Sequence, residues 1–179
     1  MMSSMNKPIV GILMGSDSDL AVMKDAAIVL KEFGIDSEVH TLSAHRTPDA
    51  VVEYVEASEK AGYKVFICGA GGAAHLAGVV AAHTALPVVG VPMMNKTTGG
   101  IDALYSTVQM PPGIPVATVA INGAKNAGIL AAQIIGSGDE VVREKVTAFK
   151  AKMAKEIKGK DDELQQKGFQ TYLTDHGLV

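Results

Sequence analysis

Five short apolar stretches alternate with five segments of helical periodicity, and this alternation constrains the fold more than any other feature. The strand-like stretches occupy residues 8–14, 35–42, 64–68, 87–91 and 115–121. Helical spacing follows them over residues 20–33, 48–61, 73–83, 101–109 and 125–135. Strands joined through helices are parallel and have right-handed crossovers. We therefore predict an α/β protein, a three-layer α/β/α sandwich around a parallel five-stranded sheet in the flavodoxin-like order 2-1-3-4-5.

The chain reads as a single domain, residues 1–179, with its core over 8–136 and a lysine-rich helical extension over 139–179. Apolar residues recur at helical spacing in the extension, at Val142, Val146, Phe149, Met153 and Ile157. After Gly159, a second short helix is expected from Leu164, Phe169, Tyr172 and Leu173. Because the five-stranded core is already complete, we expect the stripe to pack on a neighbouring subunit rather than on its own domain.

Charge and composition exclude several classes of partner. The net charge of -3 argues against a general nucleic-acid binder, which needs a basic face. The apolar run over 9–14 is too short for a signal or membrane segment, so we expect a cytoplasmic protein with no membrane partner. The single cysteine, Cys68, lies in an apolar strand and reads as a small core residue rather than a nucleophile.

Three polar loops follow the first three strands, and the predicted strand order places them side by side. They are residues 15–19, 43–46 and 69–72, and ligands bind at this edge of parallel sheets. His45 can exchange a proton near neutral pH, and Arg46 offers a planar fork suited to phosphate. Behind them, Thr47 can cap a helix whose first residue is Pro48. A plain surface turn explains this loop alone about equally well.

The first loop, GSDSD, opens a helix and could hold an anion through Ser16 and backbone N–H groups. A helix end contributes only about 0.3–1 kcal/mol to anion binding when exposed. A bound phosphate would therefore need Arg46, and Asp19 fits better as an acceptor for sugar hydroxyls. Taken alone, the pentapeptide favours plain helix capping.

The third loop, GAGG, resembles a dinucleotide fingerprint only loosely, because no acidic residue follows about 20 positions later. A phosphate-accepting receiver domain needs an acidic residue where Gly69 and Ala70 stand. What remains is a loop without side chains, in which Gly71 lets a ligand lie against the backbone. His75 either faces that ligand or packs locally. The other histidines lack metal-ligand spacing. The three loops together predict a phosphorylated, sugar-containing small molecule near His45, with no metal and no redox cofactor.

Five motifs carry a resemblance to a known family: GSDSD, SAHRTPD, GAGGAAHLAG, VQMPPGIPVATVAI and NAGILAAQI. They resemble the 5-(carboxyamino)imidazole ribonucleotide mutases of purine biosynthesis, the bacterial class I branch of the phosphoribosylaminoimidazole carboxylase catalytic subunits. The resemblance runs from about residue 9 to residue 135. It implies a homo-octamer that moves a carboxylate from the exocyclic nitrogen to ring carbon 4 without ATP, metal or other cofactor. It also implies roles for single residues: His45 as general acid and base, Ser16, Asp19 and Arg46 as ribonucleotide ligands, and Ser43, Gly71 and His75 as lining of the site.

The loop over 93–100 departs from the family, because it lacks the usual serine-leucine pattern, and Ala77 replaces a frequent proline. Two alternatives stay open. One is the related carboxylase, which uses free carbon dioxide. The other is a nucleotide-binding sensor without enzymatic activity, which would need Arg46 for phosphate but no proton carrier at His45.

Overall fold

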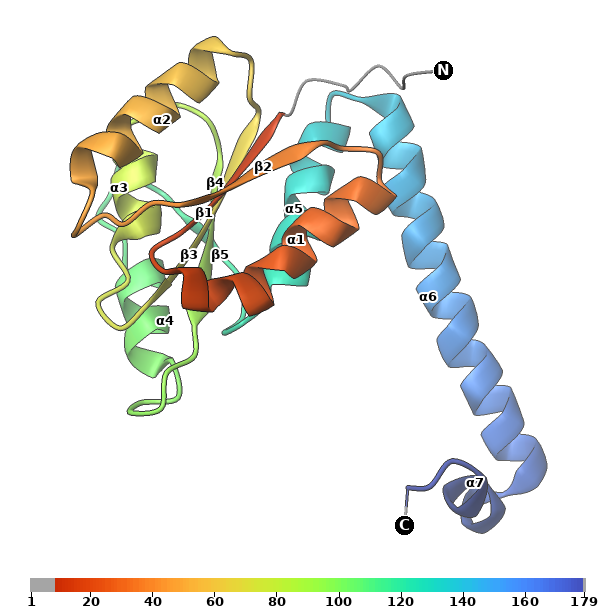
Figure 1. The fold of residues 1–179 in the computed structure, drawn as a ribbon. Helices are drawn as coiled ribbons and strands as arrows, with labels where there is room; N and C mark the ends of the chain where they lie inside the picture. The colour runs from red at the N-terminus through yellow and green to blue at the C-terminus, as the bar shows by residue number, and fades with distance from the viewer. Residues whose placement is uncertain (1–8, 179) are drawn as a thin grey trace.

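A parallel sheet in the order β2-β1-β3-β4-β5 forms the middle layer of the protein (Figure 1), and the predicted order is confirmed. The computed structural model describes residues 9–178, so the predicted strand residue Pro8 lies outside the described residues. The strands are β1 (Val10–Met14), β2 (Ser37–Thr41), β3 (Val65–Gly71), β4 (Val88–Met93) and β5 (Ala117–Thr118).

Helices cover both faces of the sheet, with α1 and α5 on one side and α2, α3 and α4 on the other (Figure 1). A short 3-10 turn, η1 (Asp17–Asp19), leads into α1. The helices of the sandwich are α1 (Leu20–Glu32), α2 (Pro48–Lys60), α3 (Leu76–Ala82), α4 (Ile101–Val108) and α5 (Ala124–Gly136). Within residues 9–178, no helix is long and apolar enough to cross a membrane.

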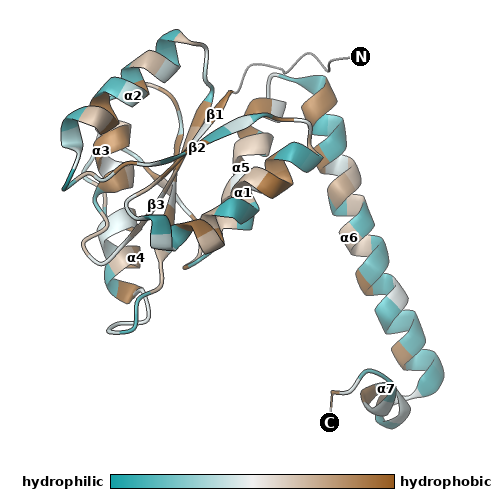
Figure 2. Cartoon of the chain, in the orientation of Figure 1, coloured by the Kyte–Doolittle hydropathy of each residue, from teal (hydrophilic) through white to brown (hydrophobic). Residues whose placement is uncertain are grey.

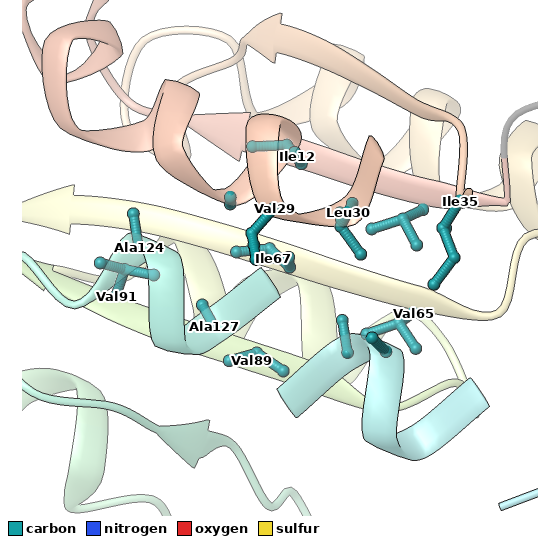
Figure 3. Packing of buried hydrophobic residues seen from close by; sticks show 14 of the residues in the cluster. Ile12, Val29, Leu30, Ile35, Val65, Ile67, Val89, Val91, Ala124 and Ala127 are labelled. Carbon is teal, nitrogen blue, oxygen red and sulfur yellow. The ribbon is translucent and has the colours of Figure 1, made fainter. Parts of the chain in front are cut away.

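Two cores lie on opposite faces of the sheet, because successive residues of each strand point to opposite layers. Ile12 and Ile67 are register partners on the α1 and α5 side (Figure 3). Leu13 and Cys68 are register partners on the α2 and α3 side. Burial on both faces explains the continuous apolar runs in the sequence. Burial also raises the pKa of the Cys68 thiol far above its usual range, so this side chain is an inert core residue.

The ends of several elements differ from the sequence prediction. β3 was expected to end at Cys68 but continues through Gly71, because β4 runs on to Met93 and pairs with it there. The following helix, expected from residue 73, therefore begins only at Leu76. β5 was expected over 115–121 and comprises only Ala117–Thr118, at the edge of the sheet, where Pro115 cannot donate to a ladder.

The C-terminal extension contains one long helix, α6 (Glu140–Lys167), and the short α7 (Phe169–Asp175). The expected break at Gly159 is wrong, because α6 continues through it and ends only at Gly168, whose φ of 76° favours glycine. A single glycine inside a helix costs only about 1 kcal/mol. Helical neighbours with strong propensity and (i, i+4) ion pairs such as Lys167 with Glu163 offset that cost.

The expectation that the apolar stripe of α6 packs on a neighbouring subunit is wrong for its first part, which packs on the sandwich of the same chain. Val142 and Val146 are buried against α5, and the Phe149 ring meets Phe33 edge to face at 5.4 Å. Lys145 Nζ donates to the Phe33 carbonyl at 2.9 Å, a favourable place for a cation at the end of α1. Beyond this point α6 leads away from the sandwich with α7 folded at its far end (Figure 1). Figure 2 shows that this outer part is mostly hydrophilic with isolated apolar residues. Ile157, in this part of α6, is exposed.

Candidate active site

The three polar loops converge on one cavity of about 760 Å³ at the carboxyl edge of the sheet. This follows from the strand order, since β1 lies between β2 and β3 and all three strands end at the same edge. All seven site residues expected from the sequence line the cavity: Ser16, Asp19, Ser43, His45, Arg46, Gly71 and His75.

In the first loop, Ser16 caps the η1 turn. Its hydroxyl oxygen accepts hydrogen bonds from the Ser18 backbone N–H at 3.4 Å and the Ser18 hydroxyl at 2.9 Å. Asp19 closes the turn just before α1. Burial raises the pKa of the Asp19 carboxyl, against the lowering effect of the Ser18 hydroxyl, and the nearby Asp17 raises it further. Asp19 is therefore an acceptor in a partly dehydrated position, suited to a neutral hydroxyl rather than to an anion.

Arg46 joins the first two loops. Its Nη2 donates to the Gly15 carbonyl, and its backbone N–H and Nε donate to the Ser43 hydroxyl oxygen at 3.2 and 3.4 Å. The guanidinium is thereby held at the junction of β1 and β2 while its side chain remains exposed. A planar cation in this place can bind a phosphate or a carboxylate with two parallel hydrogen bonds.

Thr47 stabilises the second loop rather than the helix behind it. The expected side-chain cap of α2 is absent, although Pro48 does occupy the first position of the helix. The Thr47 hydroxyl instead accepts from the Ser43 N–H at 2.9 Å and lies 3.2 Å from the Ser43 carbonyl oxygen. These bonds close the turn that presents His45 and Arg46 to the cavity.

His45 and His75 are in direct contact in the lining of the cavity. The distance from His45 Nε2 to His75 Nδ1 is 2.7 Å, and the rings meet edge to face with an interplanar angle of 82°. One nitrogen donates and the other accepts, so this hydrogen bond holds a single proton between the two rings. His75 precedes α3 and makes no capping bond with its side chain, so its partner is the histidine of the neighbouring loop. Both side chains are exposed to the cavity and can reach a bound molecule.

The glycine loop, residues 69–72, provides a wall whose one side chain is the methyl group of Ala70. Gly72 has a φ of 64°, a left-handed conformation that favours glycine. At Gly71 a Cβ would meet Met93 only at an ordinary 3.5 Å, so the protein itself does not require glycine there. The absence of a side chain at Gly71 leaves the backbone open to a ligand.

The loop after β4 forms the far wall, which sequence reasoning missed. Asn95 Nδ2 donates to both carboxylate oxygens of Asp102 at 2.9 Å, and Asn95 Oδ1 accepts from the backbone N–H groups of Thr97 and Thr98 at 2.9 and 2.8 Å. The pKa of Asp102 is lowered, chiefly by a hydrogen bond from Thr98. The Asn95-Lys-Thr-Thr-Gly run is typical of a turn in which an asparagine side chain accepts from backbone N–H groups. This run is the feature of the sequence that indicates an ordered loop here.

Asn122, in the turn between β5 and α5, fixes the start of this far wall. Its side-chain oxygen accepts from the Met94 N–H at 2.9 Å, and its own N–H donates to Pro92 at 2.8 Å. Its φ of 57° is the one positive value at a non-glycine residue within the described part of the chain. Asparagine tolerates this conformation better than most residues.

The cavity thus offers a cation, a hydroxyl acceptor and a shared proton in separate places. Arg46 marks an anion end, Asp19 a position for a polar neutral group, and the histidine pair a position for proton transfer. Across residues 9–178, no group of three His, Cys, Asp or Glu side chains is arranged to hold a metal ion.

Comparisons with known proteins identify the same family that the five sequence motifs resemble. The AIR carboxylase family model matches residues 9–156. The N5-carboxyaminoimidazole ribonucleotide mutase of Thermotoga maritima is 57% identical over 166 residues, which are 93% of this chain and 97% of that protein. The mutase of Synechocystis sp. is 53% identical over 166 residues, 93% of this chain and 94% of that protein. Among solved structures, PurE of Treponema denticola matches with a TM-score of 0.82 and 33% identity, covering 88% of this chain and 99% of that one.

Proposed function

Since this chain belongs to the AIR carboxylase family, we propose that it is an N5-carboxyaminoimidazole ribonucleotide mutase of purine biosynthesis. This isomerase moves a carboxylate from the exocyclic nitrogen of the ribonucleotide to ring carbon 4. The product is 5-amino-4-imidazolecarboxylate ribonucleotide. High identity to named mutases over almost the whole of both chains supports this reaction.

The ribonucleotide phosphate binds at the Arg46 end of the cavity. A guanidinium has five N–H donors, and its bonds to Ser43 and Gly15 involve only Nε and Nη2. The remaining N–H donors form a planar edge that binds the phosphate through parallel hydrogen bonds. The hydroxyl of Ser16 donates to the same phosphate. Asp19 then accepts a hydrogen bond from a ribose hydroxyl, which places the imidazole ring toward the glycine loop.

His45 supplies and removes the protons that the reaction needs. Protonation of the exocyclic nitrogen breaks its bond to the carboxylate and releases carbon dioxide. The freed amine makes the ring an enamine, and carbon 4 attacks the carbon dioxide before it escapes. A base then takes the proton from carbon 4 and restores the aromatic ring. A histidine that gave the first proton is the base required for the last step.

The 2.7 Å pair of His45 and His75 is the observation that carries this mechanism. The hydrogen bond to the neighbouring imidazole can orient the His45 ring toward the ligand. The wall at Gly71 gives the carbon dioxide a place against the backbone, where exclusion of water limits its loss.

We also propose that the protein works as a homo-octamer in the cytoplasm. The long α6 carries exposed apolar residues, Met153 and Ile157, beyond its contacts with its own sandwich. Such a helix is well suited to packing on another subunit. The family resemblance supplies the number eight, and the single cysteine fits a reducing compartment.

An isotope experiment tests the reaction. The purified protein receives substrate with a labelled carboxylate in unlabelled bicarbonate, without ATP or added metal. A mutase returns product that keeps most of the label. Product labelled only from dissolved carbon dioxide would instead establish the carboxylase reaction, and absence of any product would favour a sensor that only binds the nucleotide.

A further inference from the structure

Ser106 lies on α4 directly behind the glycine loop, outside the cavity lining. Its hydroxyl oxygen accepts from the Ala74 backbone N–H at 3.1 Å. The same hydroxyl lies 2.7 Å from the carbonyl oxygen of Asp102, which is its nearest acceptor. The Gly72 carbonyl oxygen is also within reach at 3.3 Å. Ser106 thus joins α4 to both ends of the turn between β3 and α3.

This contact connects the far wall of the cavity to the histidine pair. The carboxylate of Asp102 accepts a hydrogen bond from Asn95. The backbone carbonyl oxygen of Asp102 accepts one from the Ser106 hydroxyl. Ser106 in turn holds Ala74, whose side chain is only 1% exposed and which immediately precedes His75. A displacement of this turn would move the His75 ring away from His45.

Without the hydroxyl, the Ala74 N–H would be buried with no acceptor. Unpaired buried donors are strongly disfavoured, and the least costly relief is movement of the turn toward solvent. Besides Ser106, the turn is held by the buried Ala74 side chain and by a hydrogen bond from the His75 N–H to the Ala73 carbonyl oxygen at 3.0 Å. Gly72 has no side chain, and Ala73 is exposed.

We propose that Ser106 is a positioning residue, which fixes the turn over Gly72–Ala74 and so holds His75 against His45. This role rests on the proposed mutase function only for its kinetic consequences. The effect on the geometry of the turn is independent of the reaction. Ser106 acts through Ala74 and does not itself contact the substrate.

The test compares Ser106→Ala with Thr107→Val. Thr107 is the next residue of α4, and its hydroxyl donates to Ala103 within the same helix at 2.7 Å. Each variant removes one hydroxyl from α4, but only the first removes a contact with the turn. Hydrogen exchange of the peptide over 69–79, followed by mass spectrometry on the ligand-free protein, reads the turn directly. We expect faster exchange in Ser106→Ala and unchanged exchange in Thr107→Val.

Kinetics supply the second readout. In Ser106→Ala, kcat should fall by about tenfold to hundredfold, the scale expected for a misplaced catalytic group. KM should change little, because Ser16, Asp19 and Arg46 are untouched, and the pH profile of kcat should shift with the loosened histidine pair. Ser106→Thr keeps the hydroxyl and should restore both exchange and kcat.

Unchanged exchange and unchanged kcat in a folded Ser106→Ala protein would overturn the proposal, as would equal losses in Thr107→Val. If Ser106→Ala does not fold, Ser106→Cys keeps the volume with a weaker acceptor and is read in the same way. Faster exchange in a protein that proves not to be a mutase would uphold the positioning role and reject only the reaction.

Discussion

His45 Nε2 and His75 Nδ1 lie 2.7 Å apart, although 30 residues separate them in the chain. Two imidazoles at this distance share one proton in a single hydrogen bond, which fixes how the two rings face each other. In the reaction proposed above, proton transfer to the substrate nitrogen and from carbon 4 takes place at this pair.

Replacing either histidine should separate their roles. His45→Asn removes the proton carrier at nearly constant shape, and we expect kcat to fall by about 10²–10⁴-fold with substrate binding retained. His75→Asn should reduce kcat less and alter its pH dependence. Steady-state kinetics across pH, with binding measured by calorimetry, give both quantities. Near-normal turnover in His45→Asn would transfer the catalytic role to His75.

Arg46→Ala should weaken binding of the phosphorylated substrate. Each hydrogen bond to a charged group contributes about 1.5–3 kcal/mol, so losing a bidentate contact should lower affinity by at least about a hundredfold. The matched ligand is the corresponding nucleoside without phosphate, whose affinity should change little. A loss that is equal for the two ligands would place the phosphate elsewhere. Arg46→Lys should be intermediate, because lysine keeps the charge but not the planar fork.

Glu38 should make stability depend on pH in the acid range. One carboxylate oxygen accepts from Tyr63 and from Tyr54, the latter at 3.3 Å, and lies 3.5 Å from His40 Nε2. The hydrogen bond from Tyr63 is the main reason that the pKa of Glu38 is lowered. A lowered pKa in the folded state adds stability above the unfolded pKa, near 4.3, and that stability is lost as pH falls through the folded value.

Glu38→Gln should therefore destabilise the protein at neutral pH and flatten its loss of stability in acid. The effect should stay below about 1 kcal/mol, since the glutamate side chain is 47% exposed and well screened. Urea unfolding of both proteins at neutral pH and at about pH 3 measures it. A difference between the two proteins that is the same at both pH values would contradict the assignment.

Gly128→Ala should destabilise the contact between α1 and α5. An added Cβ would lie 2.5 Å from Val29 Cγ1 and 2.8 Å from the Ala26 carbonyl oxygen, so the helices must separate. Overpacking of this kind costs about 1–3 kcal/mol. Gly159→Ala in the exposed part of α6 is the matched control, because nothing lies within 4 Å of its added Cβ. Thermal unfolding should show a lower midpoint for the first variant, and an unchanged or higher midpoint for the second.

Assembly should depend on the outer part of α6. Sedimentation velocity at micromolar concentration should give a mass well above the 18.6 kDa of one chain. Ile157→Glu places a charge in an exposed apolar position and should lower that mass, whereas Lys155→Glu should matter less. A monomer in the unmodified protein would reject the oligomer, and a mass unaffected by Ile157→Glu would place the contact elsewhere.

Much of the fold and the location of the cavity followed from the sequence. Alternation of strands and helices restricts the chain to parallel topologies, and a shared carboxyl edge then brings Ser16, Arg46 and Gly71 together. The two buried faces of β3 are visible in the unbroken apolar run before Gly69. These properties depend on periodicity and topology, which a single sequence contains.

The contacts that complete the site depend instead on packing between distant segments. Nothing in the sequence pairs Ser106 with Ala74, because the bond depends on how α4 lies behind β3. The bond from Asn95 to Asp102 likewise needs the loop conformation that Asn122 helps to fix. At Gly159 the sequence predicts a break that the structure does not have. The low helix propensity of one glycine is outweighed by the other residues of α6.

Cys68 equips the protein with a built-in reporter of sheet opening. As the sole thiol, buried in the middle of β3, it can react with a reagent only after that central strand is exposed. The rate of its modification then measures how often the sheet opens in the native protein. The cavity lies at the end of the same strand, so openings that expose Cys68 and also disrupt the cavity become rarer when a ligand is bound, by a factor that its concentration and affinity set. One natural cysteine can thus titrate the site without any label placed near it.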